Sequence, residues 1–424
     1  MDINQIYNLF LLHPVITTDS RNCPEGAIFF ALKGANFNGN QFAKETIQKG
    51  CAFAFVDEKE YADDKQIFYV PDCLTTLQQL AEKHRMTLNT PIIGVTGTNG
   101  KTTTKELIAS VLKQKYNILY TQGNLNNHIG VPMTLLQLKK EHEIAIIEMG
   151  ANHPGEIKTL VNIARPNYGI ITNVGKAHIE GFGSFEGVIN TKCELYDFLK
   201  ENNGKAFVNQ ENEILFNKAQ QKGIATIPYG KGANIDAEIL SSDPFLSIQW
   251  NGHQIKSQLI GRYNLENIVA AIAIGKNFQL SDEQIVNAIE NYTPTNNRSQ
   301  FKQTERNELI IDAYNANPTS MNASLDNFIL INGKEKAVIL GDMKELGTVS
   351  DSEHQKVADK LSQSTISEIL LIGPNFAKTN CPRAKKFNDV TALNDYLSKN
   401  PINGKLVLVK GSNSMKLIEC VGLL

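Results

Sequence analysis

The sequence predicts an α/β protein of three domains, and two observations support this prediction. The chain has 424 residues, which at about 100 to 200 residues per domain corresponds to roughly three domains. From residue 91 onward, short apolar runs alternate with helical patterns, as in parallel strands joined by helices. We expect domains at 1–83, 84–294 and 295–424.

The N-terminal domain is expected to be a small α/β module. Its apolar runs at 27–32, 51–56 and 67–70 are short and separated by turns rich in Gly and Asn. A helix is expected over 42–49.

The central domain is expected to form a P-loop-type parallel sheet. A region that alternates with period two, 234–260, predicts an antiparallel appendage. Strands are expected at 91–95, 117–120, 145–149, 168–174 and 205–208, and helices from 101, through 200, over 265–277 and over 282–291.

A linker rich in Pro, Asn and Ser, 292–300, separates this domain from a second, Rossmann-like α/β series. Strands are expected at 308–312, 336–342, 368–373 and 406–411, with helices after Pro318, from Ser352 and after the final strand.

The composition excludes several classes of protein. Lys and Arg number 42 and Asp and Glu 44, a net charge of −2, which disfavours a uniformly basic nucleic-acid binder. The six cysteines are widely spaced, with Cys51 and Cys73 the nearest pair at 22 residues apart, so no Cys-x-x-Cys metal or redox motif is present. No run of 18 apolar residues and no export signal is found. We expect a cytoplasmic protein without a membrane span.

A glycine-rich turn between a predicted strand and a predicted helix indicates a nucleotide site. In PIIGVTGTNGKTTTKELIASVLKQ, backbone N–H groups at the helix start would face phosphate oxygens, Lys101 would reach the outer phosphates and Thr102 would bind Mg²⁺. The match to G-x-x-x-x-G-K-[ST] is imperfect because Val95 stands in place of the first Gly. A plain turn with a surface lysine is the alternative. We predict ATP or GTP binding by Thr96, Gly97, Thr98, Asn99, Gly100, Lys101, Thr102 and Thr103.

Polar residues at the carboxyl ends of the other central strands are expected to gather at the same edge. Glu148 follows four apolar residues and would be a second Mg²⁺ ligand, or an ordinary acid at a strand end. His178 lies in the loop after the next strand, where a surface histidine is the alternative. From its own position in the sequence, Lys192 is expected to be a solvated lysine. Asn126 and Asn127 offer amide groups to a polar ligand, or form a turn.

The C-terminal half repeats this arrangement. Asp312 ends one strand and precedes Tyr314, Asn315 and Asn317, which suit a ribose, a base or an amine. Asp342 ends another strand and would be a second polar group of this kind, or it would be a helix N-cap. Arg298, in the linker, would reach a phosphate between the two domains. Together these residues predict a cleft that closes over a nucleotide.

The chain contains, in this order, the segments TGTNGKTTT, GNLNNHIGVP, EMGA, NVGKAHIEGFGS, TKCELY, YNLENIVAA, DAYNANPTSM, LGDMKELG and VKGSNSM. Together these segments resemble the Mur ligases. The N-terminal segment 20–42 also resembles the uridine-nucleotide domain of that family, with Asn38 and Asn40 where Asp and His are expected.

This resemblance implies an ATP-dependent amide ligase of peptidoglycan precursor synthesis. ATP would phosphorylate the terminal carboxylate of UDP-N-acetylmuramoyl-tripeptide, whose third residue is lysine or diaminopimelate, and the amine of D-alanyl-D-alanine would attack the acyl phosphate. Two Mg²⁺ ions are implied, one held by Thr102 and Glu148 and the other by His178 and Lys192. The matching lysine of the family has a carbamate, which implies the same for Lys192.

The resemblance also assigns binding residues, and a monomer is expected. Lys101, Lys192, His178 and Glu148 would be catalytic. The adenosine contacts would be Asn264, Asn267, Asp312 and Tyr314, with Arg298 also on ATP; the substrate contacts would be Asn126, Asn127, Asn315 and Asn317, with Ser20, Arg21 and Gly34 on the uridine nucleotide.

Two other functions are compatible with the phosphate loop. One is another amide ligase of the same superfamily, such as a folylpolyglutamate synthase or a different Mur ligase. The other is a nucleotide-binding switch that hydrolyses ATP to change shape. Phosphate release with each substrate omitted in turn distinguishes the three.

Overall fold

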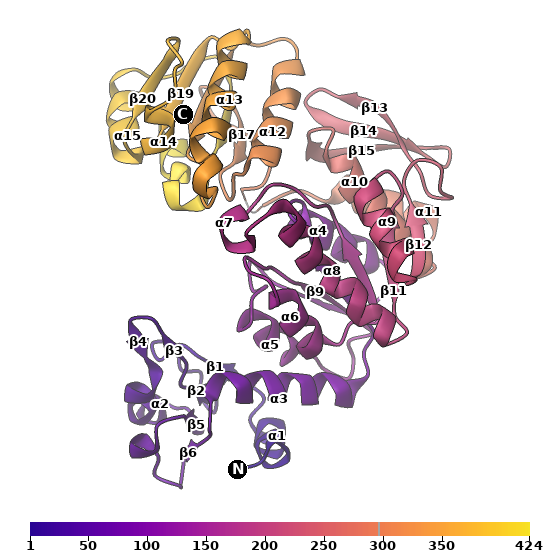
Figure 1. Cartoon of the computed structure of the whole chain (residues 1–424), viewed down its shortest axis with the longest axis vertical. Helices are drawn as coiled ribbons and strands as arrows, with labels where there is room; N and C mark the ends of the chain where they lie inside the picture. The colour runs from indigo at the N-terminus through magenta and orange to yellow at the C-terminus, as the bar shows by residue number, and fades with distance from the viewer. Residues whose placement is uncertain (296) are drawn as a thin grey trace.

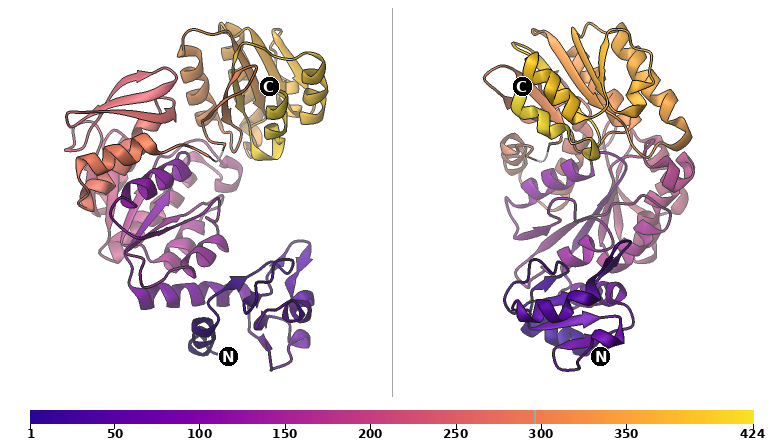
Figure 2. Two further views of the ribbon diagram at one scale, coloured as in Figure 1. Left: turned by 180° about the vertical axis from the view of Figure 1, so that it is seen from behind. Right: turned by 90° about the vertical axis from the view of Figure 1, so that its left-hand side faces the viewer.

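A computed structural model describes residues 1–295 and 297–424, and it shows three α/β units arranged along one long axis (Figure 1). The N-terminal unit lies at one end, the C-terminal unit at the other, and the largest unit between them. Figure 2 shows from two further sides that the N-terminal unit meets the rest mainly through one long helix. The three-domain α/β prediction is confirmed.

The N-terminal unit contains a four-stranded parallel sheet in the order β1-β2-β5-β6 and a separate antiparallel hairpin, β3-β4. The expected helix over 42–49 is present as α2. The elements are α1 (Ile3–Leu12), β1 (Ile16–Thr17), β2 (Ile28–Phe30), β3 (Lys33–Gly34), β4 (Phe37–Asn38), η1 (Gly39–Phe42), α2 (Ala43–Gln48), β5 (Phe53–Val56), η2 (Lys59–Tyr61) and β6 (Ile67–Tyr69).

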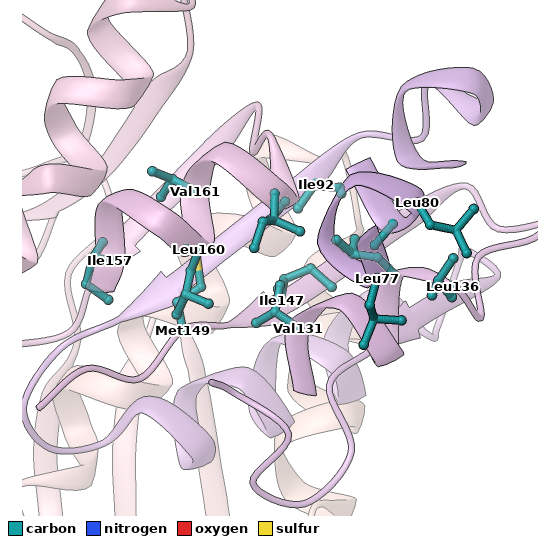
Figure 3. Close-up of a cluster of buried hydrophobic side chains, with 14 of the residues drawn as sticks. Leu77, Leu80, Ile92, Val131, Leu136, Ile147, Met149, Ile157, Leu160 and Val161 are labelled. Carbon is teal, nitrogen blue, oxygen red and sulfur yellow. The ribbon is translucent and has the colours of Figure 1, made fainter. Parts of the chain in front are cut away.

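Helix α3 (Cys73–Leu88) joins this unit to the central one. Asp72 caps its first turn by accepting a hydrogen bond from the Thr75 N–H at 2.6 Å. Leu77 and Leu80 of α3 pack against buried side chains of the central unit (Figure 3). The boundary expected between residues 83 and 84 therefore lies within a continuous helix.

Two polar side chains at the C-terminal end of α3 fix it to its surroundings. The Nδ1 atom of His84 accepts from the Tyr7 hydroxyl of α1 (3.2 Å), and Nε2 donates to the Leu138 carbonyl (2.9 Å). The Arg85 guanidinium donates to the Ala164 carbonyl (3.1 Å). Buried polar groups of this kind are costly unless paired, so these bonds specify one orientation of the helix.

The central unit is built on a six-stranded parallel sheet in the order β12-β11-β10-β7-β9-β8, with an antiparallel three-stranded sheet, β13-β14-β15, beside it. The elements after α3 are β7 (Ile92–Thr96), α4 (Lys101–Leu112), β8 (Ile118–Tyr120), α5 (Gly130–Leu135), β9 (Ile144–Glu148), α6 (Glu156–Ala164), β10 (Tyr168–Ile171), α7 (Ile179–Phe182), α8 (Phe185–Glu201), β11 (Lys205–Asn209), α9 (Glu213–Lys222), β12 (Ala225–Tyr229), β13 (Glu238–Ser242), β14 (Phe245–Trp250), β15 (His253–Ile260), α10 (Asn264–Asn277) and α11 (Asp282–Asn291).

Alternate side chains of each central strand face opposite layers of helices. On β7, Ile92 joins the core under α3, α5, α6 and α8, whereas Ile93 and Val95 join the core under α4, α10 and α11. This period of two is the geometry of a strand covered on both faces. Both faces are apolar, which explains why the expected strands appear in the sequence as continuous apolar runs.

The C-terminal unit has a second six-stranded sheet in the order β16-β17-β21-β18-β19-β20, parallel except for β16 at its edge. Its elements are β16 (Gln300–Gln303), β17 (Glu308–Asp312), α12 (Pro318–Leu330), β18 (Lys336–Gly341), η3 (Gly347–Val349), α13 (Ser350–Gln363), β19 (Glu368–Ile372), α14 (Pro374–Ala377), β20 (Ala384–Phe387), α15 (Val390–Lys399), β21 (Leu406–Lys410), η4 (Asn413–Met415) and η5 (Leu417–Leu423).

One expected element has a different form. The helix expected after the final strand is a pair of 3₁₀ turns, η4 and η5, separated by Lys416 in the left-handed conformation (φ 53°). A residue in that conformation interrupts α-helical hydrogen bonding. In the described parts of the chain, every helix is too short or too polar to cross a membrane.

Candidate active site

The turn between β7 and α4 is held in place by close backbone packing. Gly97 has φ 140°, and a Cβ there would lie 2.1 Å from the Thr172 hydroxyl oxygen. Gly100 has φ 78°, and its Cβ would lie 2.6 Å from Asn267 Oδ1. The Thr172 hydroxyl also donates to the Asn99 carbonyl at 2.6 Å. Both glycines are therefore required for the loop that presents the N-terminus of α4, a general anion site.

Lys101 is folded back over this loop. Its Nζ donates to the carbonyls of Gly97 (2.9 Å) and Thr98 (3.0 Å). Burial lowers the pKa of Lys101 to about 8, and the nearby Glu148 carboxylate opposes that shift. These carbonyls keep the ammonium at the loop, where a phosphate oxygen would be a stronger partner than either.

Glu148 ends β9 and is buried beside the loop. Its Oε1 accepts from the Thr102 hydroxyl (3.2 Å) and from Asn126 Nδ2 (2.8 Å), while its Oε2 is buried with no hydrogen-bond partner. A carboxylate oxygen with free lone pairs next to a hydroxyl is a donor set that suits Mg²⁺. Groups of three or more His, Cys, Asp or Glu that could hold a metal are absent from the described residues.

Lys192 is buried in α8, so its interpretation as a solvated lysine is wrong. Only 2% of the residue is exposed, its Nζ donates to the Ala151 carbonyl at 3.3 Å and lies 5.2 Å from the centre of the Phe182 ring. Burial, together with the charge of Lys101, lowers the pKa of Lys192 to about 7. A substantial fraction of this amine is therefore neutral near neutral pH.

His178 joins the central and C-terminal units. It precedes α7 with φ 52°, and its Nδ1 contacts the Glu345 carboxylate. Burial lowers the pKa of the imidazole, and Glu345 opposes that shift. The residue is therefore not a free surface histidine.

The C-terminal unit contributes a second set of polar groups. Parallel pairing of β17 with β21 places Asp312 beside Lys410, whose side chains form an ion pair. The Arg298 guanidinium lies 4.0 Å from the centre of the Tyr314 ring, a stacked cation–π geometry.

An amide pair crosses between the two units. Asn317 Nδ2 donates to Asn99 Oδ1 at 2.7 Å, and Asn99 Nδ2 donates back to Asn317 Oδ1 at 3.4 Å. The phosphate loop is thereby in direct contact with the start of α12.

These groups surround one cavity of about 920 Å³ between the central and C-terminal units. Leu74 and Gln78 of α3 also line this cavity. The sequence-predicted residues that line it are Thr98, Asn99, Gly100, Lys101, Thr103, Asn126, Asn127, Glu148, His178, Asn264, Asn267, Arg298, Asp312, Tyr314 and Asn315.

Known proteins match the chain over nearly its whole length. Residues 14–85 match the catalytic domain of the Mur ligase family, 95–275 the Mur ligase middle domain and 297–413 the Mur ligase glutamate ligase domain. The chain belongs to the Mur ligase family.

One curated relative and two solved structures are similar to this Mur ligase over most of its length. The UDP-N-acetylmuramoyl-tripeptide–D-alanyl-D-alanine ligase of Bacillus subtilis is 33% identical, over 99% of this chain and 94% of the relative. A crystal structure of MurF from Acinetobacter baumannii has a TM-score of 0.85 at 31% identity, covering 95% of this chain and 92% of that one. MurF ligase from Thermotoga maritima in complex with ADP has a TM-score of 0.87 at 25% identity, covering 97% of both chains.

Some predicted residues of this Mur ligase lie outside the cavity wall. Thr96, Gly97, Thr102 and Lys192 lie behind it, and Asn317 lines a smaller neighbouring pocket. Thr96 donates its hydroxyl to the Met149 carbonyl at 2.7 Å.

The predicted uridine-nucleotide residues lie on the N-terminal unit, away from the cavity. Arg21 is exposed and paired with Asp19 at 2.9 Å, the backbone carbonyl of Ser20 accepts from Lys49 at 2.9 Å, and Gly34 is in the β3-β4 hairpin. The structure does not bring these three residues into the central cavity.

The two asparagines that depart from the family pattern have structural partners. Asn38 Oδ1 accepts from the Asn40 side chain at 2.9 Å, and Asn40 Nδ2 also donates to Asp57 at 2.9 Å. They therefore fix the turn after β4.

Three predicted amide residues have structural bonds as well. Asn267 accepts from the Thr104 hydroxyl (2.9 Å) and donates to Asn264 (2.7 Å), which ties α10 to α4. Asn127 Oδ1 accepts from the Gly130 N–H at 2.9 Å, as in the turn interpretation.

Asp342 binds the start of a helix, although it is not an N-cap residue as the alternative interpretation proposed, because the N-cap position of α14 is Gly373. Its carboxylate accepts from the N–H groups of Asn375 and Phe376, both at 3.0 Å, at the start of α14.

Sequence reasoning missed several groups at the site. Asn173 and Lys410 both end apolar strands, so the strand-end argument applied to Glu148 would have found them. Asn173 Oδ1 accepts from the Asn99 N–H at 2.9 Å. Lys105 lies four residues after Lys101, on the same side of α4, but its spacing alone does not distinguish it from a surface lysine.

Proposed function

We propose that this Mur ligase joins D-alanyl-D-alanine to UDP-N-acetylmuramoyl-tripeptide at the expense of ATP, in the synthesis of peptidoglycan precursors. The observation that supports this most directly is the near-full-length similarity to the Bacillus subtilis ligase of that name. The cavity adds chemical support, because it combines a phosphate loop, a buried carboxylate and a buried amine.

The first step is transfer of the γ-phosphoryl group of ATP to the terminal carboxylate of the tripeptide. The oxygen of the carboxylate forms a bond to phosphorus, the bond to the β-phosphate oxygen breaks, and ADP leaves. Such transfer depends on positioning and charge neutralisation. The N–H groups at the start of α4 and the Lys101 ammonium supply both, since they converge on one side of the cavity.

In the second step the amine of D-alanyl-D-alanine attacks the acyl carbon. The new C–N bond forms, inorganic phosphate leaves and the amine loses a proton. Water would compete for the acyl phosphate, so a closed cavity is needed. The Asn99–Asn317 bonds and the His178–Glu345 contact join the two units that would close.

Magnesium, when bound, would neutralise the charge that develops on the phosphoryl oxygens. Thr102 and Glu148 would hold one ion, since Glu148 Oε2 is free of hydrogen bonds. His178 and Lys192 would serve a second.

Lys192 would contribute to the second site as a carbamate. An ammonium would repel a cation, whereas a carbamate formed from CO₂ and the neutral amine is an anion. The low pKa of Lys192 and its burial favour that reaction.

The three units would have separate tasks. Residues 1–83 would hold the uridine nucleotide through Ser20, Arg21 and Gly34, residues 84–294 would bind ATP and residues 295–424 would close over both. Adenosine would contact the region of Asn264, Asn267, Arg298, Asp312 and Tyr314, and the peptides that of Asn126, Asn127, Asn315 and Asn317. All six cysteines are free thiols, which is consistent with a cytoplasmic location.

A substrate-omission assay tests this function. Phosphate release from ATP is expected only when the muramoyl-tripeptide nucleotide and D-alanyl-D-alanine are both present, and product mass must increase by one dipeptide less water. Both tripeptides, ending in lysine or in diaminopimelate, belong in the assay. Release with neither substrate would favour a nucleotide switch, and release with folate and glutamate would favour a folylpolyglutamate synthase.

A further inference from the structure

Lys105 is a fully buried lysine on α4, one turn after Lys101, with 0% of its surface exposed. Its Nζ donates to the Thr121 carbonyl at 2.5 Å and lies 3.0 Å from Glu106 Oε1 and 3.9 Å from Glu148 Oε2. Lysines are almost never fully buried without a specific partner. Here the ammonium faces the carboxylate that is proposed to bind magnesium.

Thr121 couples the two residues through its own atoms. Its carbonyl accepts from Lys105, and its hydroxyl oxygen accepts from the Glu148 N–H at 3.0 Å. Thr121 itself is buried. Thr121 therefore links the Lys105 ammonium to the backbone of Glu148, the residue whose side chain has the buried carboxylate.

The separation of 3.9 Å between Lys105 Nζ and Glu148 Oε2 is too long for a hydrogen bond. Oε2 consequently keeps its lone pairs, while the positive charge still compensates the buried carboxylate, because charge interactions weaken only slowly with distance in a poorly hydrated interior. A direct hydrogen bond would instead occupy the oxygen that a metal ion needs.

We propose that Lys105 is a positioning residue that acts as the counter-charge of Glu148. It compensates the charge of the buried carboxylate before magnesium binds and, by repelling the ion, keeps magnesium affinity low enough for the ion to leave with ADP. This inference rests on the proposed function, because it requires that Glu148 bind the ion.

Removal of Lys105 is expected to change magnesium affinity in opposite directions under two possible roles of this residue. If Lys105 serves only to pack α4, removing it disorders Glu148 and magnesium binds more weakly or equally. If it is a counter-charge, removing it leaves an uncompensated carboxylate and magnesium binds more tightly. The sign of the change therefore decides between the two.

The experiment is calorimetric titration of MgCl₂ into the full-length protein, without nucleotide and again with ADP, corrected by a protein-free titration. Lys105→Met is expected to bind Mg²⁺ about tenfold more tightly than wild type. Lys113→Met is the matched control, because Lys113 follows α4, is exposed and also faces the Tyr120 ring; it should leave affinity unchanged.

Glu148→Gln provides the second arm of a double-mutant cycle. Glu148→Gln alone should weaken Mg²⁺ binding at least tenfold, and adding Lys105→Met to it should change nothing further. If Glu148→Gln has no effect, the metal site of the proposed function is wrong. If Glu148→Gln weakens binding but Lys105→Met does not tighten it, only the counter-charge role is overturned.

If Lys105→Met does not fold, the unfolding temperature of the double variant provides the test. An uncompensated Glu148 carboxylate would then be the cause, so the double variant, which lacks both charges, should fold with an unfolding temperature near that of Glu148→Gln. A double variant that also fails to fold would overturn the proposal, since Lys105 would then be needed as the partner of Thr121 or Glu106.

Discussion

Two buried lysines lie near the phosphate loop, Lys105 on α4 and Lys192 on α8, and their surroundings differ. Lys105 on α4 has two carboxylates within 4 Å, at 3.0 and 3.9 Å. Lys192 on α8 has a carbonyl at 3.3 Å and an aromatic ring, and a second cation, Lys101, acts on it. With carboxylates within 4 Å, a buried lysine serves as a fixed positive charge. Where only a carbonyl and an aromatic ring are that close, burial favours the neutral amine.

The difference shows that the number of buried lysines says little about the charge of a site. The formal count of 42 Lys and Arg treats both residues as cations. The two proposals give them opposite tasks: Lys105 would reduce the negative charge around a metal, and Lys192, once carbamylated, would increase it. Variants of the three lysines at the loop test this contrast.

The largest effect is expected for Lys192→Met. Loss of the amine removes the carbamate, and kcat should fall about 10²- to 10³-fold, the usual loss when one charge-stabilising group is removed. Steady-state ligation measures kcat, and ADP affinity from calorimetry should stay within a few-fold of wild type. Lys200→Met, at an exposed position of the same helix, is the control. More than a tenth of wild-type activity in Lys192→Met would rule out the carbamate.

Lys101→Met should lower kcat about 10²-fold, because the loop loses the cation that meets the outer phosphates. A second result sharpens the contrast between the lysines. The charge of Lys101 lowers the pKa of Lys192, so removal of that charge should raise the pKa of Lys192 and move the acid limb of the residual pH profile to higher pH. An acid limb that stays in place would show that the charge of Lys101 does not act on Lys192. Measurement of the profile in both proteins at fixed dissolved CO₂ decides this.

The pH dependence of wild-type activity should follow the neutral form of Lys192. With its pKa at about 7, the neutral fraction falls about tenfold between pH 8 and pH 6, and activity at a fixed, limiting concentration of dissolved CO₂ should fall by the same factor. Saturating CO₂ should flatten the profile. A pH profile that is the same at limiting and at saturating CO₂ would contradict carbamate formation.

The smallest effect is on stability. The pKa of Lys192 is about 7 in the folded protein against 10.5 for an ordinary lysine, so between these values the unfolded chain binds a proton that the folded chain has released. Raising the pH through this interval therefore favours folding. In CO₂-free buffer, Lys192→Met should be more stable than wild type near pH 7, by a margin that shrinks towards pH 10. A margin independent of pH would show that the amine stays charged when buried.

The sequence was sufficient for most strands and for part of the site. Continuous apolar runs identified most strands of the six-stranded sheets in the central and C-terminal units, and the strand-end argument placed Glu148 and Asp312 at the cavity. The helix after the last strand was wrong in type, because the left-handed Lys416 is a tertiary outcome that periodicity does not encode.

Burial and contacts between units could not be read from the sequence. Lys192 has the same local pattern as a surface lysine, and only the packing of α8 against the loop after β9 removes it from water. The Asn99–Asn317 bonds join residues 218 apart, and His178 meets Glu345 across two units. The positions of such partners depend on how the units dock, for which a single sequence has no periodic signal.

Helix α3 has a consequence for the length of the substrate. Its 16 residues span about 24 Å. The thiol of Cys73 donates to the Phe55 carbonyl of β5 at one end, and Arg85 fixes the other end to the central unit. Because the helix is fastened at both ends, it sets a fixed distance between the two units. If the N-terminal unit holds the uridine nucleotide as proposed, the substrate carboxylate would reach the phosphate loop only when the peptide has enough residues to span that distance, and shorter precursors would bind without reaching ATP.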